Sequence, residues 1–306
     1  MAGYLLARFA QLVVAVWGIA TLVFVLLRLS GDPVTLFVND QTTPAQVEQI
    51  RHQLGVDQPL PVQYAQFLQR AALGDFGTSL RLGQPALAVV LGRLDATVQL
   101  ALVSLALSIL VGVPVGIVSA ARRGSTLDHL SMVAAVLAQG IPTFLLALVL
   151  IWVFGVELRW LPVGDRGTPE HLILPSMALA AYSLARLARL TRSAMLEVLD
   201  QDYMRTAHAK GLSRWLSLRR HALRNAAVPV LTTIGFTFAQ FIGGAVITET
   251  VFAWPGIGRL LIQAVGERDY PVVQAAVVVI ALGVVLVNLV TDLACAAIDP
   301  RIRRSA

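Results

Sequence analysis

The chain contains five long apolar runs that include no Asp, Glu, Lys or Arg. Each run is long enough to form a helix across a bilayer, whose ~30 Å hydrocarbon core takes about 20 apolar residues. Helices satisfy their own backbone hydrogen bonds, which lipid requires. These runs, which predict five membrane-spanning helices, are Phe9–Leu27, Ala96–Ala121, Leu130–Val156, Asn225–Thr248 and Pro271–Thr291.

A sixth apolar segment, Leu172–Ala185, is shorter and is followed by Arg186 and Arg189. Long Arg side chains near a helix end can reach the membrane interface. Residues 172–191 are therefore predicted to form a sixth span. The expected fold class is an all-α integral membrane protein with six transmembrane helices. The composition agrees and excludes a soluble enzyme, because only 14% of residues are charged and the mean hydropathy is +0.73.

The basic residues predict the orientation, because cytoplasmic loops are enriched in Lys and Arg. Six spans place both termini on one side, and a cytoplasmic placement puts most of the basic residues inside. The inner set comprises Arg8, Arg122, Arg123, the nine basic residues from Arg186 to Arg224, Arg301, Arg303 and Arg304. The net charge of +6 is thus attributed to topology and lipid contact, and no nucleic-acid partner is expected. Residues 1–29 are interpreted as an uncleaved helix, because no A-x-A-like cleavage site follows the first run.

The segment 30–95 is too long for a plain connection and carries helix signals of its own. Thr43-Pro44-Ala45-Gln46 has the form of a capping box with Pro at the first helical position, which predicts a helix over 43–54. A second helix is expected over 61–73, ended by Gly74. We expect an extracytoplasmic mini-domain that is either a docking surface for an external partner or a plug over the helix ends. A transmembrane core at 95–297 and a basic cytoplasmic tail at 298–306 complete the predicted division.

The chain lacks the motifs of several enzyme classes. A P-loop requires Lys followed by Ser or Thr, but the single Lys, Lys210, precedes Gly211. Neither H-E-x-x-H nor G-x-S-x-G occurs, the five His residues are scattered, and Cys295 is the only Cys. No catalytic or metal-binding residue is therefore expected. The apolar runs also contain no ionisable residue for an ion relay, so that energy is expected to come from another subunit.

The predicted inner loop is the most informative segment for function. A helix over 201–210 is expected to end at Gly211, and Ser213 can cap a second helix that begins at Arg214. The resulting elbow, residues 200–225, is partly apolar and partly basic. It either lies in the lipid headgroup plane or fits its small residues into a groove of a partner protein.

The letters DYMRTAHAKGLS and HALRNAAVP in this loop resemble the EAA-type coupling motif of ABC-importer permeases, in the form used by the dipeptide, oligopeptide and nickel branch. Arg205, Thr206 and Arg224 depart from the general consensus, whereas RTAxAKG is similar to the variant of this branch. Further matches follow in the same order along nearly the whole chain: LLRLSGDP, LGDFGTSLR, WLPVGD, ARLARLTRSAMLEVL, ITETVFAWPGIGRL, RDYPVVQ and NLVTDLACAAIDPRIR.

The resemblance implies a non-catalytic type I permease in the cytoplasmic (inner) membrane. Its implied partners are a second similar permease, two cytoplasmic ATPases that use ATP and Mg²⁺, and an extracytoplasmic binding protein; the chain itself is expected to hold no cofactor. Small peptides are the expected cargo, with nickel or another small solute as the alternative. An ATP-independent channel or carrier and a membrane scaffold remain alternatives of a different class. The residues expected to contact the ATPase are Arg205, Thr206, Ala207, Ala209, Lys210, Gly211, Leu212, His221 and Asn225.

The same resemblance places Glu249, Phe252, Trp254, Pro255 and Gly256 near an outer vestibule or gate. Glu249 either lines the vestibule or forms a cap or a salt bridge with Arg259 or Arg268. Trp254-Pro255-Gly256 predicts a turn before the last span. Gly112, Pro114 and Gly116 indicate either a kink or close helix packing.

Overall fold

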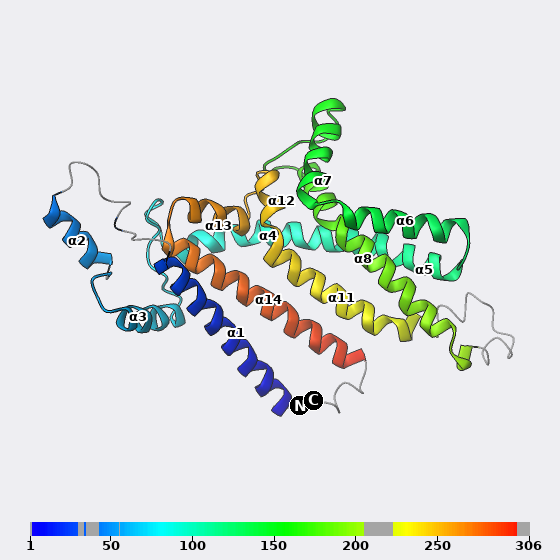
Figure 1. Ribbon diagram of the computed structural model, residues 1–306, viewed down its shortest axis with the longest axis horizontal. Helices are drawn as coiled ribbons and strands as arrows, with labels where there is room; N and C mark the ends of the chain where they lie inside the picture. Colours follow the sequence, from blue (N-terminus) through cyan, green and yellow to red (C-terminus); the bar gives the residue numbers. More distant parts are fainter. Residues whose placement is uncertain (1, 30–33, 35–42, 55, 205–222, 299–306) are drawn as a thin grey trace. The chain divides into compact units, whose positions relative to one another are not determined.

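The computed structural model describes residues 2–29, 34, 43–54, 56–204 and 223–298, and this part of the chain is helical between its loops (Figure 1). Its single β pairing is an isolated bridge between Thr78 and Pro85. The helices are α1 (Ala2–Leu29), α2 (Pro44–Leu54), α3 (Leu60–Ala72), α4 (Ala86–Leu107), the π-helix η2 (Ser108–Gly112), α5 (Val113–Ala121), α6 (Thr126–Gly140), α7 (Thr143–Leu150), the π-helix η3 (Ile151–Glu157), the 3₁₀-helix η4 (Pro169–Leu172), α8 (Ile173–Leu199), α11 (Leu223–Gly244), α12 (Val246–Val251), α13 (Ile257–Gly266) and α14 (Tyr270–Ile298).

Five helical segments of the described chain are long and apolar enough to cross a membrane. They are Ala10–Leu29, Ala86–Ala121, Pro169–Leu199, Ala226–Gly244 and Tyr270–Cys295. Large apolar side chains stay exposed along these helices and on α6, among them Leu22 and Leu130. Extended apolar surface of this kind belongs against lipid or another subunit. The prediction of an all-α integral membrane protein is confirmed.

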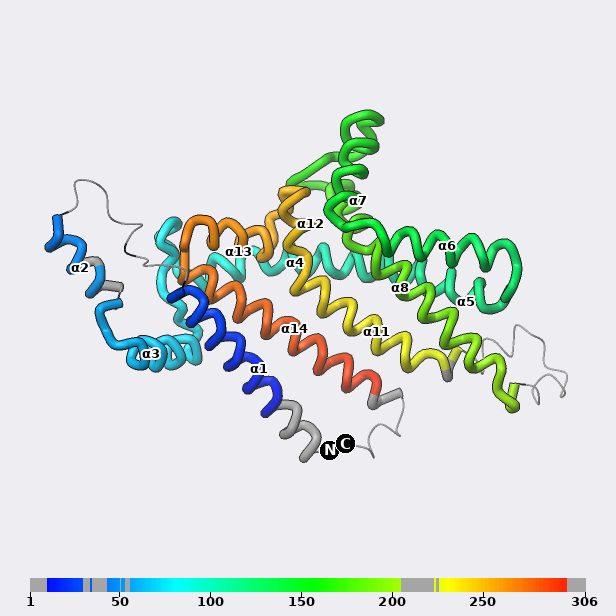
Figure 2. Tube along the Cα trace, in the orientation of Figure 1, coloured from blue at the N-terminus to red at the C-terminus, as the bar shows by residue number. Residues whose placement is uncertain are grey.

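The apolar run Leu130–Val156, predicted as one uninterrupted span, is divided between α6 and a second arm that consists of α7 and η3. Figure 2 shows α6 ending where α7 turns away, and the two axes meet at 101°. The bend follows from Ile141-Pro142: Pro142 has no N–H to donate, and it holds Ile141 in the extended conformation with φ −85° and ψ 120°. The segment is therefore a broken span or a re-entrant loop.

The chain divides into two compact units. The larger unit contains Ala96–Pro255 and the part of α14 from Val284 onward, and the smaller unit contains Ala2–Asp95 and Gly256–Gly283. Each unit has its own buried apolar cluster. Leu100, Phe241 and Trp254 belong to the larger unit, whereas Phe24, Phe67 and Val272 belong to the smaller one.

In the larger unit, η2 and α5 approach α8 closely. A Cβ added at Gly112 would lie 2.7 Å from the Leu184 carbonyl oxygen, and one at Gly116 would lie 2.5 Å from the Ala188 carbonyl oxygen. Glycines four residues apart thus bring η2 and α5 against the backbone of α8, as small residues do in membrane helix pairs. Of the two roles considered for Gly112 and Gly116, the structure shows close packing.

The smaller unit contains the insertion that follows α1, and both of its predicted helices are present as α2 and α3. The Thr43 N–H donates to Gln46 Oε1 at 2.8 Å and the Gln46 N–H to Thr43 Oγ1 at 3.4 Å, which confirms the capping box. Gly74, with φ +77°, follows the end of α3 as expected. The insertion contacts α1 directly, because the hydroxyls of Thr21 and Tyr64 lie 2.6 Å apart.

Candidate functional site

Most of the predicted coupling elbow lies outside the described residues, namely Arg205, Thr206, Ala207, Ala209, Lys210, Gly211, Leu212 and His221. The backbone of Asn225 is described, and it belongs to the first turn of α11. The roles of these residues in coupling stay predictions.

The two chain segments that enter and leave the elbow meet in one buried cluster. Met204, at the entrance, is fully buried, and Ala226, after the exit, is 3% exposed. Both belong to an apolar cluster with Met195 of α8 and Ala120 of α5. The described residues on either side of 205–222 therefore lie together against α5 and α8.

A buried carboxylate lies beside this cluster, and sequence reasoning missed it. Asp128, in the first turn of α6, is 1% exposed, and its two oxygens accept hydrogen bonds from the Arg192 guanidinium: Nε to Oδ1 at 2.6 Å and Nη2 to Oδ2 at 2.9 Å. The Ser119 hydroxyl donates to the same carboxylate, as does the Gly124 N–H at 3.0 Å. A buried carboxylate with this many donors is fully paired.

The sequence contained a signal for the position of Asp128, although not for its ion pair. Ser125 precedes Thr126-Leu127-Asp128, and the Asp128 N–H donates to Ser125 Oγ at 3.2 Å as an N-cap. Asp128 could therefore be assigned to a first helical turn, where acidic residues are common. Its pairing with Arg192 could not be read in this way, because it depends on how α6 and α8 pack.

The turn predicted at Trp254-Pro255-Gly256 lies just before these residues, at Phe252 and Ala253, and α13 follows them before the last span begins. Trp254 is 1% exposed, and its indole N–H donates to the Ala96 carbonyl oxygen at 2.9 Å. The Arg166 guanidinium carbon lies 5.8 Å from the centre of the Trp254 ring. Trp254 thereby connects the turn after α12 to α4.

Glu249 and Phe252 are buried next to this turn. The Thr97 hydroxyl of α4 donates to Glu249 Oε1 at 2.7 Å, and Glu249 is 0% exposed. Phe252 packs in a cluster with Ala147 of α7 and Leu174 of α8. Its carbonyl oxygen accepts the Asp165 N–H at 3.0 Å, which links WLPVGD to the FAWPG turn. These side chains join α4, α7, α8 and α12, and their role near an outer gate stays a prediction.

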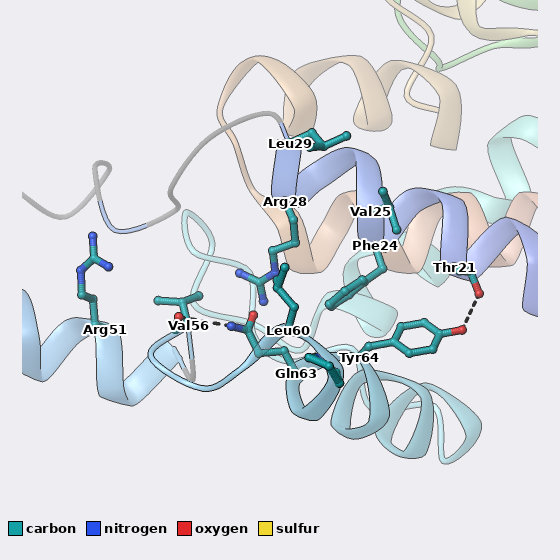
Figure 3. A pocket seen from close by; sticks show the side chains of 11 residues that line it. Thr21, Phe24, Val25, Arg28, Leu29, Arg51, Val56, Leu60, Gln63 and Tyr64 are labelled. Carbon is teal, nitrogen blue, oxygen red and sulfur yellow. Dashed lines mark hydrogen bonds between the residues drawn. The ribbon is translucent and has the colours of Figure 1, made fainter.

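The smaller unit contains a cavity of about 770 Å³ between the end of α1 and the start of α3 (Figure 3). Phe24, Val25 and Leu60 make part of its wall apolar, while Arg28 and Arg51 supply positive charge. Gln63 orders the turn before α3 by donating to the carbonyl oxygens of Val56 at 3.2 Å and Gln58 at 2.6 Å. The cavity is thus a feature of the contact between the insertion and α1.

In the described residues, no three His, Cys, Asp or Glu side chains gather as metal ligands do.

Two family models match the chain. Residues 112–304 match the family described as binding-protein-dependent transport system inner membrane component, and residues 1–101 match the N-terminal part of such a membrane component. The fold agrees: a solved structure of the MetNI methionine ABC transporter in inward-facing conformations aligns over 69% of this chain and 96% of its own, with a TM-score of 0.58 and 19% identity. An amino acid ABC transporter structure aligns over 70% and 94% with a TM-score of 0.53 and 18% identity.

Relatives are similar over nearly their whole length. A probable peptide ABC transporter permease of Sinorhizobium fredii is 42% identical over 99% of this chain and 100% of its own. A dipeptide transport system permease of Alkalihalophilus pseudofirmus is 38% identical with the same coverage. A glutathione transport system permease of Escherichia coli is 40% identical over 99% of both chains. The chain therefore belongs to the family of inner membrane components of binding-protein-dependent transport systems, in the branch that contains these ABC transporter permeases.

Proposed function

We propose that this chain is one of two permease subunits of an ATP-driven importer of small peptides. A second, similar permease, two cytoplasmic ATPases and an extracytoplasmic binding protein complete the transporter. The chain itself is non-catalytic and holds no cofactor, since ATP and Mg²⁺ are used by the ATPases. It lies in the inner membrane with both termini in the cytoplasm.

The observation that carries the proposal is the anchoring of the elbow. The segments at Met204 and Ala226 share one buried cluster with α5 and α8, and α8 continues without a break from Ile173 to Leu199. Flanking segments anchored in this way can pass a displacement of residues 205–222 to the membrane helices, which is what a subunit driven by a partner ATPase requires.

In the proposed cycle, ATP binding closes the ATPase dimer and displaces residues 200–225 of this chain. The displacement converts the permease pair from inward facing to outward facing, so that peptide can enter from the docked binding protein. Hydrolysis then returns the pair to the inward-facing state. The driving free energy comes from the ATPase, because a ligand or partner shifts such an equilibrium only by its different affinity for the two states.

Three relatives support a peptide cargo, because they are named as peptide, dipeptide and glutathione permeases and align over nearly the whole chain. A fold does not determine its cargo. Nickel or another small solute is therefore the second candidate within the same family.

Reconstitution tests this function. The tagged chain is purified in mild detergent together with its co-expressed partners and placed in liposomes with ATP at the ATPase side. We expect uptake of labelled dipeptide or tripeptide that requires both ATP and the binding protein. ATP-driven uptake of another solute would replace the peptide cargo. Conduction by this chain alone would favour a channel, and a stable complex without any flux would favour a scaffold.

A further inference from the structure

The Asp128 carboxylate connects three successive segments of the larger unit to α8. Ser119 belongs to α5, Gly124 to the turn after it, Asp128 to α6 and Arg192 to α8. Arg192 lies about two turns before the end of α8, after which the chain enters the elbow. The contact therefore joins the α5–α6 hairpin to the helix that leads into the elbow.

We propose that Asp128 and Arg192 are positioning residues that lock α8 to the α5–α6 hairpin, so that displacement of the elbow moves these helices together. The inference rests on the proposed function and adds to it the contact through which this subunit carries the displacement into its membrane helices. We call Asp128, Arg192, Ser119 and the Gly124 N–H the buried clamp, because the Asp128 side chain is 2% exposed, while that of Arg192 is 27% exposed.

An ion pair suits this task better than apolar contact does. Between membrane helices no hydrophobic driving force opposes sliding, because lipid tails are as apolar as the helix surfaces. The two parallel hydrogen bonds from Arg192 fix both the distance and the orientation of the guanidinium relative to Asp128. Separating the pair would leave a buried carboxylate without its counter-charge, which is strongly unfavourable. Helices α6 and α8 are therefore held in one register.

The exposed contacts nearby contrast with the buried clamp. Arg123, in the turn after α5, pairs with Asp200 at the end of α8 at 3.3 Å, and both side chains are largely exposed. Arg189 of α8 donates to Gln139 Oε1 of α6 at 2.9 Å, also at an exposed position. Exposed pairs contribute little to stability because water screens them. The Arg189–Gln139 contact thus joins the same two helices without burial, and it supplies a matched control.

The test distinguishes a role of the pair in transmitting displacement from a role in folding of the subunit. In the double variant Asp128→Asn with Arg192→Gln, both charges disappear together, so no unpaired charge is buried and the subunit is expected to assemble. The neutral amides cannot form the two parallel, charge-assisted hydrogen bonds of the native pair. We expect the ratio of peptide uptake to ATP hydrolysis, measured in proteoliposomes of the complete transporter, to fall by about fivefold or more. The control Arg189→Gln is expected to keep the wild-type ratio.

A second variant decides the matter if the double variant does not assemble. Arg192→Lys keeps the counter-charge but presents a point charge without the planar fork, so it is expected to assemble and to lower the ratio as well. Two outcomes would overturn the clamp. One is a wild-type ratio of uptake to hydrolysis in an assembled variant of either kind, and the other is failure of both variants to assemble, which would assign the pair to folding. Failure of the proposed function is recognised separately, because the wild-type transporter would then show no ATP-driven uptake of peptide.

Discussion

The Ser79 hydroxyl donates to Asp269 Oδ2 at 2.5 Å, although 190 residues separate the two in the chain. The Leu80 N–H donates to Oδ1 of the same carboxylate at 3.2 Å, and Arg81 forms an ion pair with Glu267. The LGDFGTSLR and RDYPVVQ segments are therefore one structural feature of the smaller unit. It holds the loop before α4 against the start of α14.

Asp269→Asn is expected to destabilise this contact. Asp269 is 3% exposed, and the substitution replaces two charge-assisted hydrogen bonds by weaker ones, which costs about 1.5–3 kcal/mol. Unfolding of the purified protein in detergent measures the effect. Glu48→Gln, at an exposed position on α2, is the control and should change stability by less than about 0.5 kcal/mol. Equal stability of the two variants would contradict the assigned role of Asp269.

Gly116→Ala is expected to separate α5 from α8. The new Cβ would lie 2.5 Å from the Ala188 carbonyl oxygen and 2.6 Å from Thr191 Cβ, and overpacking of this kind costs about 1–3 kcal/mol. Gly92→Ala on α4 is the matched control, because nothing lies within 4 Å of its Cβ. It should be neutral or stabilising, since Ala favours a helix over Gly by about 1 kcal/mol. Thermal unfolding and the yield of assembled transporter are measured for both variants. Equal results for Gly116→Ala and Gly92→Ala would contradict the prediction.

Trp254→Phe is expected to weaken the connection between the α12 turn and α4. The ring stays apolar, but the Ala96 carbonyl oxygen loses the indole N–H at 2.9 Å, which costs about 1–3 kcal/mol at a buried site. Trp152→Phe is the control, because Trp152 is 58% exposed. The comparison is made by thermal unfolding in detergent, and a smaller effect at Trp254 than at Trp152 would argue against the hydrogen bond's contribution.

Gly211→Asp is expected to uncouple ATP hydrolysis from uptake. The sequence places Gly211 at the end of the first elbow helix, where a side chain disfavours the left-handed backbone that such a helix end commonly adopts. Peptide uptake should fall at least about tenfold while the ATPases still hydrolyse ATP, equivalent to about 1.4 kcal/mol of coupling. Gly83→Asp, at an exposed position with φ +63° and nothing within 4 Å of an added Cβ, controls for the general effect of the substitution. Normal uptake by an expressed Gly211→Asp protein would refute the elbow's role.

Local signals were sufficient for several elements of the fold. The apolar runs located the membrane helices, and Thr43-Pro44-Ala45-Gln46 located the start of α2, because length, capping and Pro or Gly positions act within a few residues. The bend after α6 was missed, although Gly140-Ile141-Pro142 carries its signal. An apolar count does not register a Pro that breaks the helix within the run.

Apolar runs and motifs were enough to identify this chain as a helical membrane protein and to indicate its family. Which polar residues meet between its helices became visible only in the folded structure. Asp128 and Arg192 lie 64 residues apart, and Thr97 and Glu249 lie 152 apart. Each pair depends on the register and rotation of two packed helices. Hydropathy measures transfer from water into lipid one residue at a time, whereas a buried hydrogen bond depends on the positions of two residues at once.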